Sequence, residues 1–174
     1  NAQSLQLQSG LAGQWSASTD PGVQALPSNV DGVSSLAYGP NETLYFMSAF
    51  DRQCTFSVYS IEMQTWTRLK TPPATCGAGT IMEYDGSGSF YYLPGGATAY
   101  PSNRVYKYDI ASNSWSSLAQ FPSSVSNFSS GTIVTQGARK YLYVFRGMSS
   151  PSFWRYDITA DTWSNLPSFP TSGN

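Results

Sequence analysis

The chain has 174 residues and a formal net charge of −1; only 11% of its residues are charged, whereas 40% are hydrophobic and 15% aromatic. This apolar content suffices for one globular domain with its own core. The sequence has no basic patch to neutralise phosphates, which argues against a nucleic-acid-binding protein. No apolar run approaches the roughly 20 residues of a membrane-spanning helix, so we expect no membrane insertion.

The first segment, residues 1–31, resembles an incomplete structural unit. Residues 4–9 (SLQLQS) alternate polar and apolar side chains like a strand, and residues 13–18 (GQWSAS) match the last strand of the units that follow. No other strand precedes them. We therefore expect two outer strands of a partial unit, followed by a linker.

Three units with one common plan follow, at residues 32–73, 74–122 and 123–174. Each consists of four short runs of β-forming residues, separated by turns rich in Gly, Asn, Asp and Ser. The expected strands are 33–38, 44–48, 55–60 and 65–69; then 78–84, 89–93, 104–108 and 114–118; and finally 131–135, 141–145, 153–157 and 162–166. No stretch shows a convincing helical period.

The units are internal repeats, which indicates that their shared residues are packing residues. In each unit an aromatic residue stands seven positions before a Trp, and a Leu follows that Trp by three positions. The pairs are Tyr59 and Trp66, Tyr108 and Trp115, and Tyr156 and Trp163, and the Leu residues are Leu69, Leu118 and Leu166. Asp109 and Asp157 directly follow the third strand of their units, where we expect them to cap turns.

Four-stranded antiparallel units at a period of 48–49 residues are typical of β-propeller blades. With the Tyr-Asp pairs at 108–109 and 156–157, the Trp seven residues after each Tyr and the glycine break after the second strand, residues 32–170 resemble the kelch-repeat β-propeller family. The resemblance implies an all-β fold of three complete four-stranded antiparallel blades plus an N-terminal partial blade. Together these would form one domain or part of a larger propeller.

The sequence argues against an enzyme. Some kelch-like propellers are copper oxidases that resemble galactose oxidase, and that chemistry needs histidine ligands, but this chain contains no His. The same absence removes the usual triad base and the commonest zinc ligand, and two cysteines cannot supply four thiolates. We expect no catalytic residue, no cofactor and no metal site.

The longer loops follow the second strand of each unit and therefore share one face of the fold. Aromatic and Arg side chains on such a face suit contact with a protein or a sugar, although ordinary loop surface is the alternative. The candidate ligand-binding residues are Phe50, Arg52, Tyr100, Arg104, Arg146 and Met148.

Several features favour a secreted or cell-surface protein. Asn41 and Asn127 begin Asn-x-Ser/Thr triplets in expected turns and are candidate N-glycosylation sites. Cys54 and Cys76 fall on one face of adjoining units, so we expect a disulfide between them.

These patterns predict an extracellular structural or interaction module that assembles with other copies or with missing parts of the same polypeptide. A carbohydrate-binding propeller and a non-catalytic fragment of a larger propeller enzyme are the alternatives. The N-terminal segment lacks the inner strands of its unit, and the third unit lacks the polar outer face of a terminal cap, so we expect a partner surface at both ends, filled by copies in an oligomer or fibre or by missing parts of the same polypeptide. The third unit carries the aromatic residues Tyr141, Tyr143, Phe145, Phe153, Trp154 and Tyr156.

Overall fold

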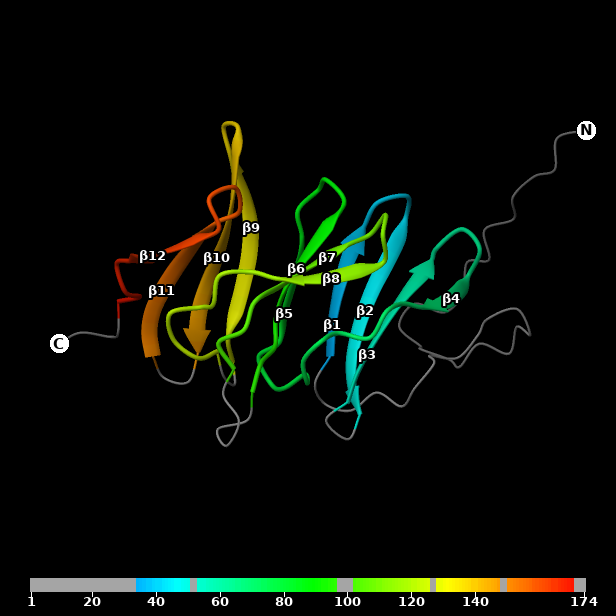
Figure 1. Cartoon of the computed structure of the whole chain (residues 1–174), viewed down its shortest axis with the longest axis horizontal. Helices are drawn as coiled ribbons and strands as arrows, with labels where there is room; N and C mark the ends of the chain where they lie inside the picture. The colour runs from blue at the N-terminus through cyan, green and yellow to red at the C-terminus, as the bar shows by residue number, and fades with distance from the viewer. Residues whose placement is uncertain (1–33, 51–52, 97–101, 126–127, 148–149, 171–174) are drawn as a thin grey trace, which may run out of the picture.

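The computed structural model describes residues 34–50, 53–96, 102–125, 128–147 and 150–170. In these ranges the chain forms β-strands and no helix, which confirms the all-β prediction (Figure 1). The described residues accordingly include no helix long and apolar enough to cross a membrane. The partial unit predicted at 1–31 lies outside the described residues.

The strands form three antiparallel sheets of four, each with its strands in chain order. The first sheet consists of β1 (Ser34–Gly39), β2 (Thr43–Phe50), β3 (Gln53–Ser60) and β4 (Thr65–Arg68). The second consists of β5 (Ile81–Tyr84), β6 (Ser89–Leu93), β7 (Tyr106–Asp109) and β8 (Ser114–Ser117). The third consists of β9 (Ser130–Gln136), β10 (Arg139–Gly147), β11 (Ser150–Asp157) and β12 (Thr162–Leu166).

The strand register explains the seven-residue spacing between Tyr and Trp. The two residues face each other across the hairpin between the third and fourth strands, as Tyr108 and Trp115 do. The turn between them ends two residues before the Trp, in the left-handed region, with φ of 56° at Gln64, 47° at Asn113 and 53° at Asp161. Asn and Asp tolerate this conformation better than most residues, so the turn chemistry repeats with the fold.

One strand is shorter than expected by several residues. The predicted strand 78–84 begins only at Ile81, because the backbone N–H of Thr80 donates to the carbonyl of Gly77 at 3.1 Å and closes a turn. Small residues in this stretch had suggested a strand, but a backbone that bonds within its own turn cannot also pair with β6.

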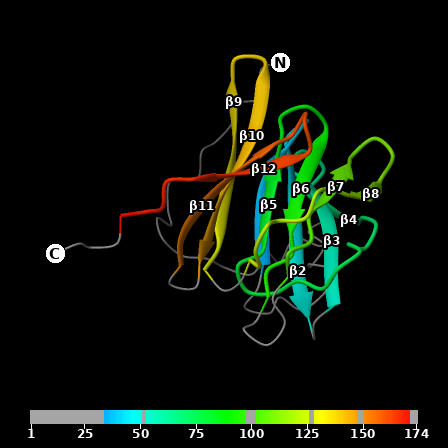
Figure 2. The ribbon, with the colours of Figure 1, turned by 60° about the vertical axis from the view of Figure 1, so that its left-hand side comes forward.

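The three sheets lie side by side in chain order (Figure 1), and the rotated view shows the same succession (Figure 2). Two buried clusters form the core, one between the first and second sheets and one between the second and third. We call the side of each sheet that carries its Trp the leading face, with Trp66, Trp115 and Trp163 as its markers, and the opposite side the trailing face. In both clusters a trailing face packs against the leading face of the next sheet.

Candidate functional site

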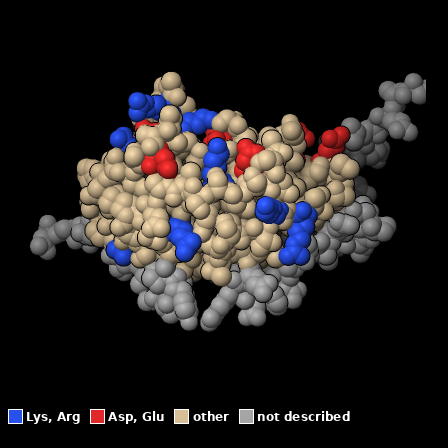
Figure 3. All heavy atoms as spheres, in the orientation of Figure 1, with Lys and Arg blue, Asp and Glu red and all other residues tan. Residues whose placement is uncertain are grey.

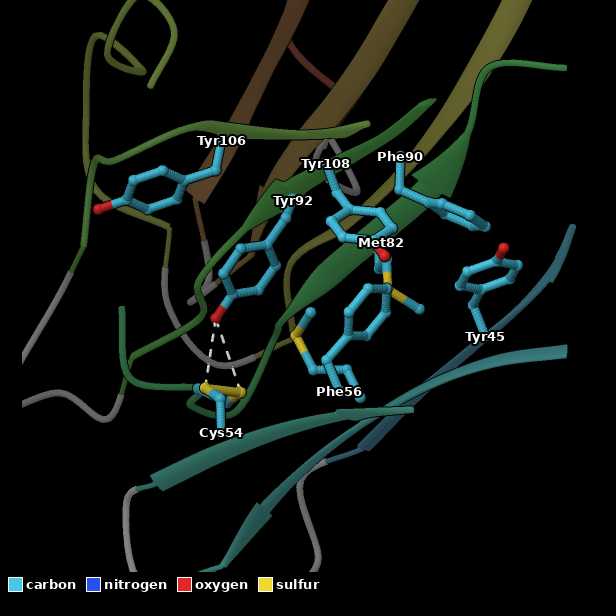
Figure 4. Close-up of a cluster of buried hydrophobic side chains, with 10 residues drawn as sticks. Tyr45, Cys54, Phe56, Met82, Phe90, Tyr92, Tyr106 and Tyr108 are labelled. Carbon is cyan, nitrogen blue, oxygen red and sulfur yellow. Dashed lines mark hydrogen bonds between the residues drawn. A yellow bond between two sulfur atoms is a disulfide. The ribbon is translucent and has the colours of Figure 1, made fainter. Parts of the chain in front are cut away.

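The first and second sheets meet through aromatic side chains (Figure 4). Phe56 on the trailing face of the first sheet lies 4.8 Å from Tyr108 and 5.3 Å from Trp115, measured between ring centroids. Tyr45 lies 4.3 Å from Phe90 in the same way. These offset and edge-on contacts add to the stabilisation from burial alone.

The second and third sheets repeat this arrangement. Phe121, which follows β8, lies 4.8 Å from Trp163 and 5.7 Å from Trp154 between ring centroids. Tyr91 lies 6.3 Å from Tyr156. Trp154 and Tyr156 therefore face the second sheet, which corrects our expectation that they lie on an uncovered face.

A pair of hydrogen bonds joins each sheet to the next. Both bonds are made by the backbone of the residue that stands four positions after the Trp of the preceding sheet. The indole Nε1–H of Trp115 donates to the carbonyl of Lys70 at 2.9 Å, and the N–H of Lys70 donates to Oδ1 of Asn113 at 3.0 Å. Trp163 and Asp161 bond Ala119 in the same way, at 3.1 and 2.8 Å. We call this arrangement the inter-sheet bond pair.

In each inter-sheet bond pair, the Asx side chain also accepts a hydrogen bond from a buried Tyr hydroxyl. The Tyr108 hydroxyl donates to Oδ1 of Asn113 at 2.8 Å, and the Tyr156 hydroxyl donates to Oδ1 of Asp161. Burial raises the pKa of Tyr108 to about 12, and burial together with the Asp161 carboxylate also raises the pKa of Tyr156. Both hydroxyls therefore remain protonated donors at any physiological pH.

Cys54 and Cys76 lie at disulfide distance, as predicted, with Cα atoms 5.4 Å apart. The bond links β3 to the segment before β5, and so the first sheet to the second. The hydroxyl of Tyr92 lies 3.5 Å from the Cys54 sulfur and 3.6 Å from that of Cys76 (Figure 4). Both cysteines are buried, so the covalent link is part of the packed interface.

The third sheet has a trailing face with no sheet against it among the described residues. Tyr143, Phe145 and Phe153 line an open groove there of about 550 Å³, together with residues of β9. Their register equivalents are buried by the next sheet: Tyr45, Met47 and Phe56 in the first sheet, and Tyr91, Leu93 and Val105 in the second. The groove therefore has the side-chain pattern of a closed sheet-to-sheet interface, but no sheet packs against it within the described ranges.

Phe169 marks the same open interface. It stands six residues after Trp163, as Phe121 stands six after Trp115, and equivalent backbone bonds hold the two: Phe121 N–H to Asn103 at 2.8 Å and Phe169 N–H to Pro151 at 2.9 Å. Phe121 is 1% exposed and Phe169 is 62% exposed. Sequence analysis missed Phe169, although its fixed distance from Trp163 was a usable signal.

The leading face of the first sheet is open in the same sense. Leu36 is 59% exposed, whereas Met82, its equivalent in the second sheet, is 2% exposed. Trp66 contacts Phe46 and Tyr59 of its own sheet, at 5.9 and 5.0 Å between ring centroids. We had expected all three Trp residues to pack between sheets, but in the described part of the chain only Trp115 and Trp163 do so.

The predicted ligand-binding residues are not brought together by the described structure. Arg146 donates from Nε to the carbonyl of Ser124 at 3.1 Å, and from its terminal nitrogen to Ser150 Oγ at 3.5 Å, so it links the segment before β9 to the start of β11. Arg104 is exposed. Arg52, Tyr100 and Met148 lie outside the described residues, as does the side chain of Phe50, so a sugar-binding loop face stays a prediction.

Other predicted positions fall in turns. Asn41 is exposed in the β1–β2 turn with φ of 54°, and Asn127 lies outside the described residues. Asp109 accepts the N–H of Ser112 at 2.8 Å, and Asp157 accepts those of Thr159 and Ala160 at 3.0 Å each. These bonds lower the pKa of both carboxyls, and they are the turn-capping bonds that we expected.

In the upper part of the viewed surface acidic and basic side chains are mixed, whereas the charged side chains lower down are basic (Figure 3). The described residues contain no group of three or more His, Cys, Asp or Glu side chains placed to hold a metal ion. We therefore take the closed and open sheet interfaces as the candidate functional site.

Comparisons with known proteins support the fold. No protein-family model matches the chain, and no curated protein sequence matches it. Among solved structures it is similar to that of YjhT, with a TM-score of 0.60 and 15% sequence identity over 83% of this chain and 53% of that chain. The chain thus spans about half the length of that structure, and the likeness shows a β-propeller-like fold in which the three sheets correspond to blades.

Proposed function

We propose that this chain is an extracellular structural or interaction module, a kelch-like propeller segment that assembles with further blades. One observation carries the proposal: Phe169 is held by the same backbone bond as Phe121, yet it is 62% exposed where Phe121 is 1% exposed. A side chain placed for a blade interface and left uncovered indicates a surface that another blade covers.

The physical argument is the cost of leaving the interface open. Each closed interface buries large aromatic and aliphatic side chains, and such burial contributes about 1.5–3 kcal/mol for each one. Tyr143, Phe145 and Phe153 stand at these positions on the third blade and remain in an open groove. A partner blade would recover this stabilisation, so the open face favours association.

The repeat chemistry supports the kelch-like assignment. The Tyr-Asp pair at the end of the third strand combines a buried Tyr that bonds the Asx side chain with an Asp that caps the turn. The following Trp then bonds the preceding blade. One short motif therefore fixes the turn, the blade core and the contact between blades.

Extracellular placement is part of the proposal. The buried Cys54–Cys76 pair suits an oxidising compartment, where disulfides persist. Asn41 offers an exposed turn that a glycan would occupy without disturbing the core. With no His in the sequence, we propose a role in assembly and not in catalysis.

Thiol protection in the native source tests this function. Phe145→Cys places a thiol in the groove, and Phe128→Cys places one at a site that is 85% exposed. We expect the thiol at 145 to react slowly with a maleimide and the thiol at 128 to react fast. Equal, fast reaction at both positions would show that nothing covers the groove and would contradict the proposed function.

A further inference from the structure

The two open faces of this chain both depart from the repeat at the same hydrogen bond. The residue four positions after each Trp bonds the next blade with its carbonyl and its N–H, as Lys70 and Ala119 do. After Trp163 this residue is Pro167, which has a carbonyl but no N–H. The trailing face of the third blade therefore offers an acceptor and lacks the usual donor.

On the leading face of the first blade, a longer side chain stands in the place of the matching acceptor. Asn113 and Asp161 accept the N–H in the closed interfaces, and the equivalent residue before Trp66 is Gln64, with the same left-handed φ of 56°. Its side chain is one methylene longer, and its amide donates as well as accepts. Next to Pro167, the Trp66 indole and the Gln64 amide would both donate to one carbonyl, which has two lone pairs.

The apolar surfaces also correspond. Phe121 packs against Trp163 in a closed interface, and an equivalent fit brings Phe169 against Trp66. On the partner side Leu36 and Tyr38, 59% and 62% exposed, occupy the leading-face positions that fill the interface in the second blade. Each open face therefore carries apolar side chains that could cover those of the other face.

Charge supports the same pairing. The β1–β2 and β9–β10 hairpins point to the same end of the molecule (Figure 1), and Lys140 next to the second of them reaches Ser87 of the neighbouring blade at 2.8 Å. In an equivalent contact the β9–β10 hairpin would meet the β1–β2 turn. Arg139, which pairs with Asp157 of its own blade at 3.0 Å and has a side chain 64% exposed, would then also face Glu42.

We propose that the occupant of the groove is a second copy of this chain, which docks the leading face of its first blade on the trailing face of the third blade. This inference rests on the proposed function and names its partner. Because the contact joins two different surfaces, it repeats from copy to copy until the ring closes. Two copies contribute six of the blades described here, within the four to eight of typical propellers, so we propose a closed pair.

Sedimentation equilibrium on purified chain, at tens of micromolar, tests the pairing. We expect twice the 18.9 kDa of one chain. Phe169→Asp alters the trailing face, Leu36→Asp alters the leading face, and Phe128→Asp is the matched control on exposed surface. We expect each of the first two variants to sediment as a single chain and the control to remain paired.

Mixing the two face variants distinguishes head-to-tail docking from other contacts. Each retains one unaltered face, so an equimolar mixture of Phe169→Asp and Leu36→Asp should regain the paired mass. Circular dichroism confirms that each variant is folded, and Tyr38→Asp replaces Leu36→Asp if that variant unfolds. A Leu36→Asp protein that pairs like the unaltered chain, a mixture that stays single, or mass that grows beyond two chains would overturn the proposal.

A single-chain mass for the unaltered protein would also overturn it. The proposed function would survive that result if the thiol at position 145 is protected in the native source, because another polypeptide would then cover the groove. If that thiol is unprotected as well, both proposals fail.

Discussion

At the scale of single residues, this fold depends on a few positions that each serve several contacts. Oδ1 of Asn113 accepts a hydrogen bond from the Tyr108 hydroxyl within its own blade and another from the N–H of Lys70 in the preceding blade. Its backbone also takes the left-handed conformation that ends the turn. Asn or Asp suits this position because its side chain is short and ends in a strong acceptor, and because its backbone tolerates positive φ.

Trp115 and Trp66 occupy equivalent sequence positions in different surroundings, so substitutions at the two positions can be compared directly. Trp115→Ala removes contacts with Phe56, Tyr92 and Tyr108, and the bond to Lys70, so we expect a loss of about 3–5 kcal/mol in the free energy of unfolding. Trp66→Ala should cost less in the single chain, because among the described residues the ring contacts of Trp66 are with its own sheet. Urea unfolding of both variants at low concentration measures the difference; equal losses would contradict it.

Asp109 and Asp157 predict a pH dependence. Hydrogen bonds from Ser112 and Ala160, respectively, lower the pKa of these carboxyls below its ordinary value. A lowered pKa in the folded state gives stability that is present above about pH 4 and is lost as the pH falls through the folded pKa.

Urea unfolding at pH 6 and pH 2.5 should therefore show a smaller loss of stability on acidification for the Asp109→Asn, Asp157→Asn double variant than for the unaltered chain. Asn retains one acceptor oxygen but does not titrate. An identical acid dependence in the two proteins would show that these carboxyls do not contribute.

At the scale of elements, the sequence predicted strands well because their chemistry is local. The twelve described strands match the expected ones to within a few residues, since Gly, Asn and Asp turns separate runs of β-forming residues. The Tyr and Trp pairing followed from the repeat. The start of β5 could not be predicted from the repeat. It depends on the turn closed by the bond from Thr80 to Gly77, and the small residues there do not specify that turn.

The faces of the sheets were harder to predict than the strands. Tyr141, Tyr143, Phe145, Phe153, Trp154 and Tyr156 look alike in sequence, yet alternate strand positions send Trp154 and Tyr156 toward the second blade. Only the repeat register, with Phe145 equivalent to buried Met47 and Leu93, identifies which of them remain open. The bond from Arg146 to Ser124 joins segments 22 positions apart, so the sequence did not indicate it, and ligand binding at Arg146 stays a prediction.

The Cys54–Cys76 bond joins two elements and should contribute to their stability. It closes a loop with a sequence separation of 22 residues, which the chain-entropy account values at about 3 kcal/mol. The Cys54→Ser, Cys76→Ser double variant should lose an amount of this order in urea unfolding, and the loss should match that of the reduced unaltered chain. Two free thiols in denatured, unreduced protein would rule the bond out.

At the scale of the whole molecule, the described chain is a row of three propeller blades with two closed interfaces and two open faces. The closed interfaces share one design: a Trp and an Asx side chain bond one backbone residue, and aromatic rings fill the space behind. The two open faces carry most of the equivalent side chains, but among the described residues no second sheet packs against them. At this scale we therefore propose association as the function, with a second copy of the chain as the candidate partner.

The mass of the assembly in the native source tests this account most directly. Sedimentation of gently extracted protein should show a folded species heavier than one 18.9 kDa chain, and Phe145 should be protected within it. A soluble single chain of that mass, with cooperative unfolding and an accessible groove, would contradict the account, because the open blade interface would then be stable without a partner.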